Sequence, residues 1–79
     1  RQLAVNYGGR GIRCNAICPG FIETTLVDDQ ESSWFINRTP QGRVGTPEDI
    51  AGAVRMLCSA DAAFVNGASL QVDGGFVLA

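Results

Sequence analysis

Side chains able to do acid–base or metal chemistry are scarce in this sequence of 79 residues. All six basic residues are arginine, and the chain contains neither lysine nor histidine. It therefore supplies no imidazole general base, no histidine metal ligand, no Schiff-base lysine and no phosphate-binding lysine of the Walker type. Eight acidic residues give a formal net charge of −2. Because the arginines form no basic run, the sequence argues against a nucleic acid partner.

The three cysteines predict neither a disulfide nor a metal site. Cys14 and Cys18 are four residues apart in an extended-looking run, which places them roughly 13 Å apart at ~3.3 Å per residue. That separation is too large for a disulfide. Cys58 leaves the set odd, and a zinc ion would need an acidic fourth ligand. We expect all three to be small, buried apolar side chains.

Backbone groups at the ends of two strands are better candidates for binding a ligand. The apolar run 12–18 stops at Pro19-Gly20 and predicts a buried strand. Residues 68–73 alternate between apolar and polar and predict a second strand, which ends in Asp73-Gly74-Gly75.

A well-marked helix lies between these strands, over about residues 47–59. Thr46 is a good N-cap, Pro47 suits the first helical position, and two acidic residues follow where the helix dipole favours them. One apolar stripe is expected to face the sheet, formed by Ile50, Val54, Leu57 and Cys58.

A strand, a helix and a strand predict a right-handed βαβ crossover with parallel strands. Two parallel strands are too few to be covered on both faces, so the pattern indicates the edge of a larger α/β sheet. Ligands of such sheets sit beyond the carboxyl ends of the strands. This geometry places the candidate site at 19–25, after the first strand.

The remaining segments carry weaker signals. Residues 1–7 predict the last turns of a helix, closed by Gly8-Gly9 as a left-handed C-cap. Since this helix has no cap and no initiator methionine precedes it, we expect residues upstream of Arg1. The segment 21–38 predicts one or two short helices. No apolar stretch approaches the ~20 residues that span a bilayer, and no signal peptide is evident, so we expect no membrane partner and a cytoplasmic location.

Several polar and aromatic residues have structural explanations beside functional ones. Asn15 is expected to satisfy backbone groups of a neighbouring loop, Arg43 to hold a loop through a carboxylate or carbonyl, and Asp73 to shape a turn. The apolar residues 34–36 either line a substrate pocket or pack against the body of the protein. Thr24 could be an ordinary helix N-cap.

Three motifs in order resemble the short-chain dehydrogenase/reductase family and cover nearly all of the chain. They are the run from Gly11 to Thr24, the run Pro40-x-Gly42-Arg43-x-Gly45-x-Pro47-Glu48-Asp49-Ile50-Ala51, and the run Asn66-Gly67-x-x-Leu70-x-Val72-Asp73-Gly74-Gly75. Within the family, the chain most resembles the 3-oxoacyl-acyl-carrier-protein reductase type.

The resemblance implies an α/β fold in which residues 1–79 are the C-terminal βαβ portion of a Rossmann-like, doubly wound parallel sheet. It implies NAD or NADP as cofactor, with Pro19 and Gly20 at the nicotinamide ring. The Ile22 backbone and the Thr24 hydroxyl would hold the carboxamide, which needs one donor and one acceptor. Residues 21–46 would form a lid over a carbonyl or alcohol substrate, either a small molecule or one bound to an acyl carrier, and the parent enzyme would be a homo-oligomer.

The family's glycine-rich loop, catalytic serine and Tyr-x-x-x-Lys pair lie upstream of the matching part, so no catalytic residue is assigned. Tyr7 is followed four residues later by Gly11, and the glycines at 8–11 precede a strand, which is the wrong order for the cofactor fingerprint. We expect the isolated chain to be inactive. The alternative is a non-catalytic, truncated oligomerisation module, because so short a chain buries little apolar surface alone.

Overall fold

Two short parallel strands form the centre of the molecule in the computed structural model, which describes residues 1–23 and 29–78. Strand β1 (Ala16–Pro19) pairs with β2 (Ser69–Val72), and the register runs from Ala16 opposite Ser69 to Pro19 opposite Val72. The parallel pairing expected for the βαβ pattern is confirmed. Pro19 is tolerated as the last strand residue because the amide of Gly20 donates the next hydrogen bond, to the carbonyl of Val72 at 3.1 Å.

Strand β1 begins four residues later than the sequence predicted. Preceding residues bond to the loop before β2 in place of the ladder: the Cys14 amide donates to Asn66 Oδ1 at 3.0 Å. Asn15 bridges the same loop, since its Nδ2 donates to the Val65 carbonyl at 3.0 Å and its Oδ1 accepts from the Ala68 amide at 2.9 Å. The structural role expected for Asn15 is confirmed.

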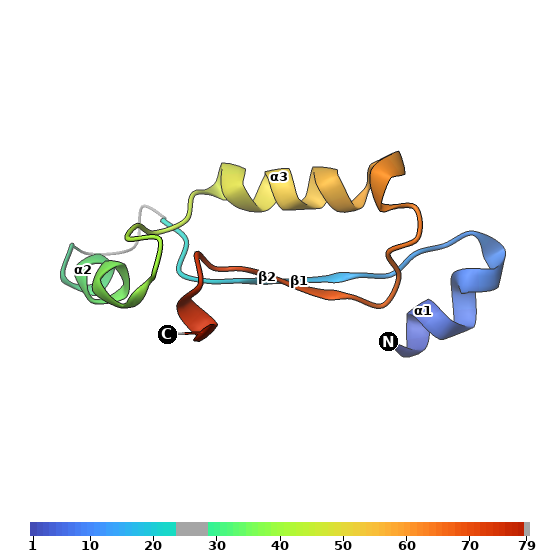
Figure 1. The fold of residues 1–79 in the computed structure, drawn as a ribbon, viewed down its shortest axis with the longest axis horizontal. Helices are drawn as coiled ribbons and strands as arrows, with labels where there is room; N and C mark the ends of the chain where they lie inside the picture. The colour runs from blue at the N-terminus through green and yellow to red at the C-terminus, as the bar shows by residue number, and fades with distance from the viewer. Residues whose placement is uncertain (24–28, 79) are drawn as a thin grey trace.

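Helix α3 (Pro47–Leu57) lies along one face of the two strands (Figure 1) and packs against both. Its N-cap is the expected Thr46, which forms a capping box with Asp49. The apolar stripe is only partly covered: Val54 is 45% exposed and Cys58 is exposed. Because two strands are narrower than the stripe, these side chains line an open groove of about 310 Å³ beside β1.

Two further helices lie at opposite ends of the strands (Figure 1). Helix α1 (Gln2–Tyr7) is at their amino ends and α2 (Asp29–Arg38) is near their carboxyl ends. The predicted left-handed cap at Gly8-Gly9 is wrong, because the chain continues as a 3₁₀ turn over Gly8–Arg10 and turns left-handed at Gly11, with φ of 79°. Short 3₁₀ turns also occupy Ala60–Ala62 and Phe76–Leu78.

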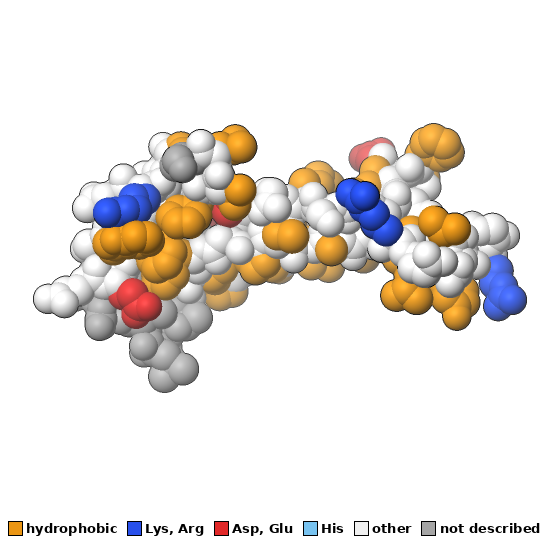
Figure 2. All heavy atoms as spheres, turned by 90° about the horizontal axis from the view of Figure 1, so that it is seen from below, with side chains coloured by type: hydrophobic (Ala, Val, Ile, Leu, Met, Phe, Trp, Pro, Cys, Tyr) orange, Lys and Arg blue, Asp and Glu red, His pale blue; other side chains and the backbone are white. Residues whose placement is uncertain are grey.

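The buried core is small. Among the described residues, the buried apolar side chains are Ala4 and Ala62, and apolar groups are spread over the surface at both ends (Figure 2). The expectation of buried cysteines is wrong, since Cys14 and Cys18 are half-buried and Cys58 is exposed. No helix among these residues is long and apolar enough to cross a membrane.

Candidate functional site

The sequence-predicted site lies where both strands end. Gly20 follows β1 directly beside Asp73, which follows β2, and a Cβ atom at position 20 would lie 2.6 Å from Asp73 Cβ. Glycine is therefore required here by the contact between the two strand ends. This packing explains the residue type without any ligand. Thr24, the other side chain expected to act here, lies outside the described residues.

Ile22 is fixed by an isolated parallel bridge to Gly45. The Gly45 amide donates to the Phe21 carbonyl at 2.9 Å, and the Glu23 amide donates to the Gly45 carbonyl at 2.8 Å. In a parallel bridge the flanking residues make both bonds, so the N–H and C=O of Ile22 itself point away from Gly45. They offer one donor and one acceptor side by side, which is the pair that a carboxamide requires.

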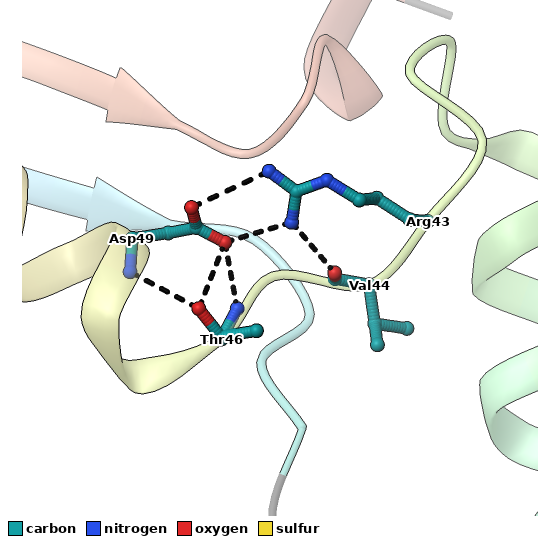
Figure 3. A network of polar contacts seen from close by, with 4 residues as sticks. All are labelled: Arg43, Val44, Thr46 and Asp49. Atoms are coloured by element: carbon teal, nitrogen blue, oxygen red, sulfur yellow. Dashed lines mark hydrogen bonds and ion pairs between the residues drawn. The ribbon is translucent and has the colours of Figure 1, made fainter.

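The loop that carries Gly45 is held by a polar network around Asp49 (Figure 3). Arg43 donates to both carboxylate oxygens, from Nη1 to Oδ2 at 2.8 Å and from Nη2 to Oδ1 at 3.3 Å. Arg43 Nη1 also donates to the Val44 carbonyl at 3.1 Å. Asp49 Oδ2 accepts from the Thr46 amide at 2.8 Å and from its hydroxyl at 3.1 Å. The predicted loop-holding role of Arg43 is confirmed.

These contacts shift the protonation equilibria of both partners. The Arg43 hydrogen bond, followed by that of the Thr46 amide, holds the pKa of Asp49 well below its ordinary value. The same hydrogen bond and the charge of Asp49 raise the pKa of Arg43. Both groups stay ionised near neutral pH, so neither is suited to transfer a proton there.

A pocket of about 330 Å³ opens among the strand ends and the loop. Its lining comprises Phe21, Ile22, Thr39, Gln41, Arg43, Gly45, Asp49, Gln71, Val72 and 73–75. The charged side chains are already engaged, since Arg43 and Asp49 pair with each other. Asp73 accepts from the amides of Gly75 at 2.9 Å and Val77 at 3.2 Å, which confirms its predicted turn role. No group of three or more His, Cys, Asp or Glu among the described residues could hold a metal ion.

An aromatic cluster ties α2 to the segment after β1. Phe35 stacks on Phe21 with ring centroids 4.1 Å apart and lies 5.4 Å from the ring of Phe76. Trp34 contacts the Phe35 ring edge-on, and the Arg38 guanidinium lies 4.0 Å from the Trp34 centroid. Residues 34–36 do not line the 330 Å³ pocket. Of the two expectations for these residues, packing against the body is the one that the contacts support.

Sequence reasoning missed the part played by Gly45. Its long-range bridge to Ile22 leaves no local pattern, because the two residues are separated by α2. The signal available was the glycine itself, although the atom that a Cβ at position 45 would approach, Ile22 Cδ1 at 2.7 Å, is the end of a flexible side chain and does not by itself demand glycine.

Comparison with known proteins decides the family. A family model described as enoyl-(acyl carrier protein) reductase matches residues 1–77. A solved short chain dehydrogenase from Bacillus anthracis is 46% identical and superposes with a TM-score of 0.82, over 99% of this chain and 30% of that one. The chain belongs to the short-chain dehydrogenase/reductase family. Its parallel strands and α3 are an α/β piece of the family's Rossmann-like fold, as the sequence predicted.

Further short-chain dehydrogenase/reductase proteins match over a similar span. The 2-(R)-hydroxypropyl-CoM dehydrogenase of Xanthobacter autotrophicus is 44% identical over 81 residues, which cover 96% of this chain and 32% of that protein. A solved structure from Agrobacterium tumefaciens, provisionally assigned as a 2-deoxy-D-gluconate 3-dehydrogenase, holds bound NADP. It is 43% identical with a TM-score of 0.89, over 99% of this chain and 34% of that one. The chain thus spans about a third of the length of the relatives that it matches.

Proposed function

We propose that these residues are the C-terminal part of an NAD(P)-dependent oxidoreductase, in which they hold the nicotinamide end of the cofactor. One observation carries this proposal: the bridge to Gly45 turns the Ile22 N–H and C=O outward, at the carboxyl end of a parallel strand. Ligands of open α/β sheets bind at such ends. The NADP bound in the Agrobacterium tumefaciens structure supports the same cofactor class.

Each residue has a stated part in this proposal. The Ile22 amide and carbonyl bond the carboxamide of the nicotinamide, and the Thr24 hydroxyl adds a further bond. Pro19 and Gly20 end β1 so that the following backbone passes close to the ring. The nicotinamide, when bound, accepts or gives a hydride, while the chain's own residues fix the ring's position and help to exclude water.

For the substrate we propose a chemical class and not an individual compound. We propose hydride transfer between the nicotinamide and a carbonyl or alcohol carbon. The name of the Xanthobacter autotrophicus relative specifies a hydroxypropyl compound, which supports an alcohol substrate. An acyl-carrier-bound 3-oxoacyl substrate is the alternative; the description of the family model names an acyl carrier protein, with an enoyl in place of a 3-oxoacyl group. The proton-transferring tyrosine and lysine would be supplied by other parts of the whole protein, so the 79 residues alone would be inactive.

Replacement of Thr24 by valine in the whole protein tests the carboxamide assignment. Loss of one neutral hydrogen bond of about 1 kcal/mol is expected to raise the KM for the cofactor about fivefold and to lower the turnover. Steady-state kinetics with NADH and NADPH measure both.

Thr25→Val is the matched control, because it removes the neighbouring hydroxyl and is expected to leave both constants near the unsubstituted values. If Thr24→Val and Thr25→Val have the same KM and turnover as the unsubstituted protein, the role assigned to Thr24 is wrong.

A further inference from the structure

The loop 43–46 links the start of α3 to the proposed cofactor segment. The carboxylate of Asp49 on α3 accepts four hydrogen bonds of 2.8–3.3 Å from Arg43 and Thr46, the first and last residues of this loop. Between those two residues lies Gly45, whose amide and carbonyl both bond to the segment 21–23. The position of Ile22 is therefore tied to a loop whose two ends are both bonded to the Asp49 carboxylate.

The ion pair between Arg43 and Asp49 restrains the loop backbone more than it stabilises the folded protein. The side chains of Arg43 and Asp49 are 55% and 34% exposed, and exposed ion pairs contribute little to folding. Arg43 is bidentate, and its Nη1 also bonds the Val44 carbonyl, directly before Gly45. The fixed fork of a guanidinium restrains both the carboxylate and the loop backbone at once.

We infer that Arg43, acting through Asp49, is a positioning residue for the backbone of Ile22. This inference rests on the proposed function, because it concerns only the binding of the nicotinamide carboxamide by the Ile22 backbone. Arg43 touches neither cofactor nor substrate in this account. Without it, the Val44 carbonyl loses its bond to the guanidinium, and Gly45 is held to α3 only from the Thr46 side, so the bridge that turns the Ile22 amide and carbonyl outward is less firmly positioned.

The test compares two ligands on the whole protein carrying Arg43→Gln. Calorimetry measures the Kd for NADH or NADPH, and the Kd for ADP-ribose or its 2′-phosphate, which lack the nicotinamide. If the Ile22 backbone is displaced from the nicotinamide carboxamide, NAD(P)H binding should weaken about tenfold. ADP-ribose binding should not change, because that ligand has no nicotinamide. A general loss of structure would weaken both ligands alike. Arg43→Lys, which keeps the charge and loses the fork, should recover only part of the NAD(P)H affinity.

A third variant provides the control. Arg55→Gln breaks the exposed ion pair between Arg55 and Glu48, which is 2.6 Å long and lies on the same helix as Asp49. Because this pair does not involve the loop 43–46, the variant should bind both ligands as the unsubstituted protein does. If Arg43→Gln does not fold, Arg43→Lys is the second probe and should show the same selective loss in smaller measure.

The possible results distinguish a failure of the positioning role of Arg43 from a failure of the proposed function. Selective loss of NAD(P)H affinity in Arg43→Gln, or in Arg43→Lys where Arg43→Gln does not fold, supports the inference. Equal loss for both ligands, or no change in either, overturns the positioning role while the proposed function stands. If the unsubstituted protein binds neither NADH nor NADPH, the proposed function fails, and the inference fails with it.

Discussion

Glycines occupy two positions of close contact at the candidate site, and at Gly20 the contact is with the backbone of the other strand end. A Cβ at Gly20 would approach Asp73 Cβ to 2.6 Å, and one at Gly45 would approach Ile22 Cδ1 to 2.7 Å. The first contact joins the ends of the two strands and the second joins the segment after β1 to the loop before α3. The sequence motif contained both glycines, but only the structure shows that Gly20 faces the Asp73 backbone and that Gly45 faces the end of the Ile22 side chain.

The charge state of Asp49 gives a prediction at this scale. The pKa of its carboxyl is lowered from an ordinary value of 3.8, chiefly by the Arg43 hydrogen bond. A carboxyl with a lowered pKa in the folded state adds stability that is fully present above its unfolded pKa and is lost as the pH falls through its folded pKa. The contribution of this pair should therefore be complete above about pH 4 and should decline only in stronger acid.

Carbon-13 NMR of the side-chain carboxyl measures this directly. Asp49 should remain ionised at about pH 3, where an ordinary aspartate is largely protonated. In Arg43→Gln the titration midpoint should rise toward the ordinary value, since the largest cause of the shift has been removed. An Asp49 midpoint at or above 3.8 in the unsubstituted protein would contradict the network described here.

Among the elements, those with strong local signals were predicted well. Thr46 and Pro47 mark the start of α3, and the capping box with Asp49 is present. The parallel pairing followed from the strand, helix and strand order. The start of β1 and the left-handed turn at Gly11 were missed, because the first depends on the hydrogen bond that the Cys14 amide donates to Asn66 Oδ1 and the second on a 3₁₀ turn that extends the helix.

The sequence alone could predict that a site follows the end of β1, but not which distant residues contact it. Rules for parallel sheets predicted a site after β1, and the described part of that segment begins at Gly20, beside Asp73 at the end of β2. The bridge between Ile22 and Gly45 has no local signal, since it depends on how α2 and the following loop return to the sheet. The exposure of Val54 and Cys58 could not be predicted either, because periodicity says which residues share a face but not how wide the opposing surface is.

Helix α3 offers a stability prediction for its N-cap. Thr46→Ala removes the hydroxyl that accepts from the Asp49 amide at 3.2 Å and donates to its carboxylate, and should lower the free energy of unfolding of the whole protein by about 1 kcal/mol. Thr46→Ser keeps the hydroxyl and should remain close to the unsubstituted protein. Denaturant unfolding measures both, and equal stability of the alanine and serine variants would show that the cap contributes nothing.

Taken as a whole, the part of the chain that the structure describes is elongated and has little buried core. The chain exposes 5822 Å², whereas a compact monomer of this mass exposes about 4,600 Å². Its radius of gyration is 15.1 Å, against about 11.6 Å for a compact domain of this length. Phe64, Leu78, Val5 and Val77 are among the large apolar side chains left exposed. Such an amount of uncovered apolar surface is typical of part of a larger folded unit.

The most direct test of the central claim is a structure of the whole protein with NAD⁺ or NADP⁺ bound. We expect the nicotinamide at the carboxyl end of β1, with its carboxamide about 3 Å from the backbone nitrogen and oxygen of Ile22. Gly45 should still be bridged to Ile22 in that complex. A nicotinamide whose carboxamide is held elsewhere, with the Ile22 backbone bonded to protein groups alone, would contradict the account.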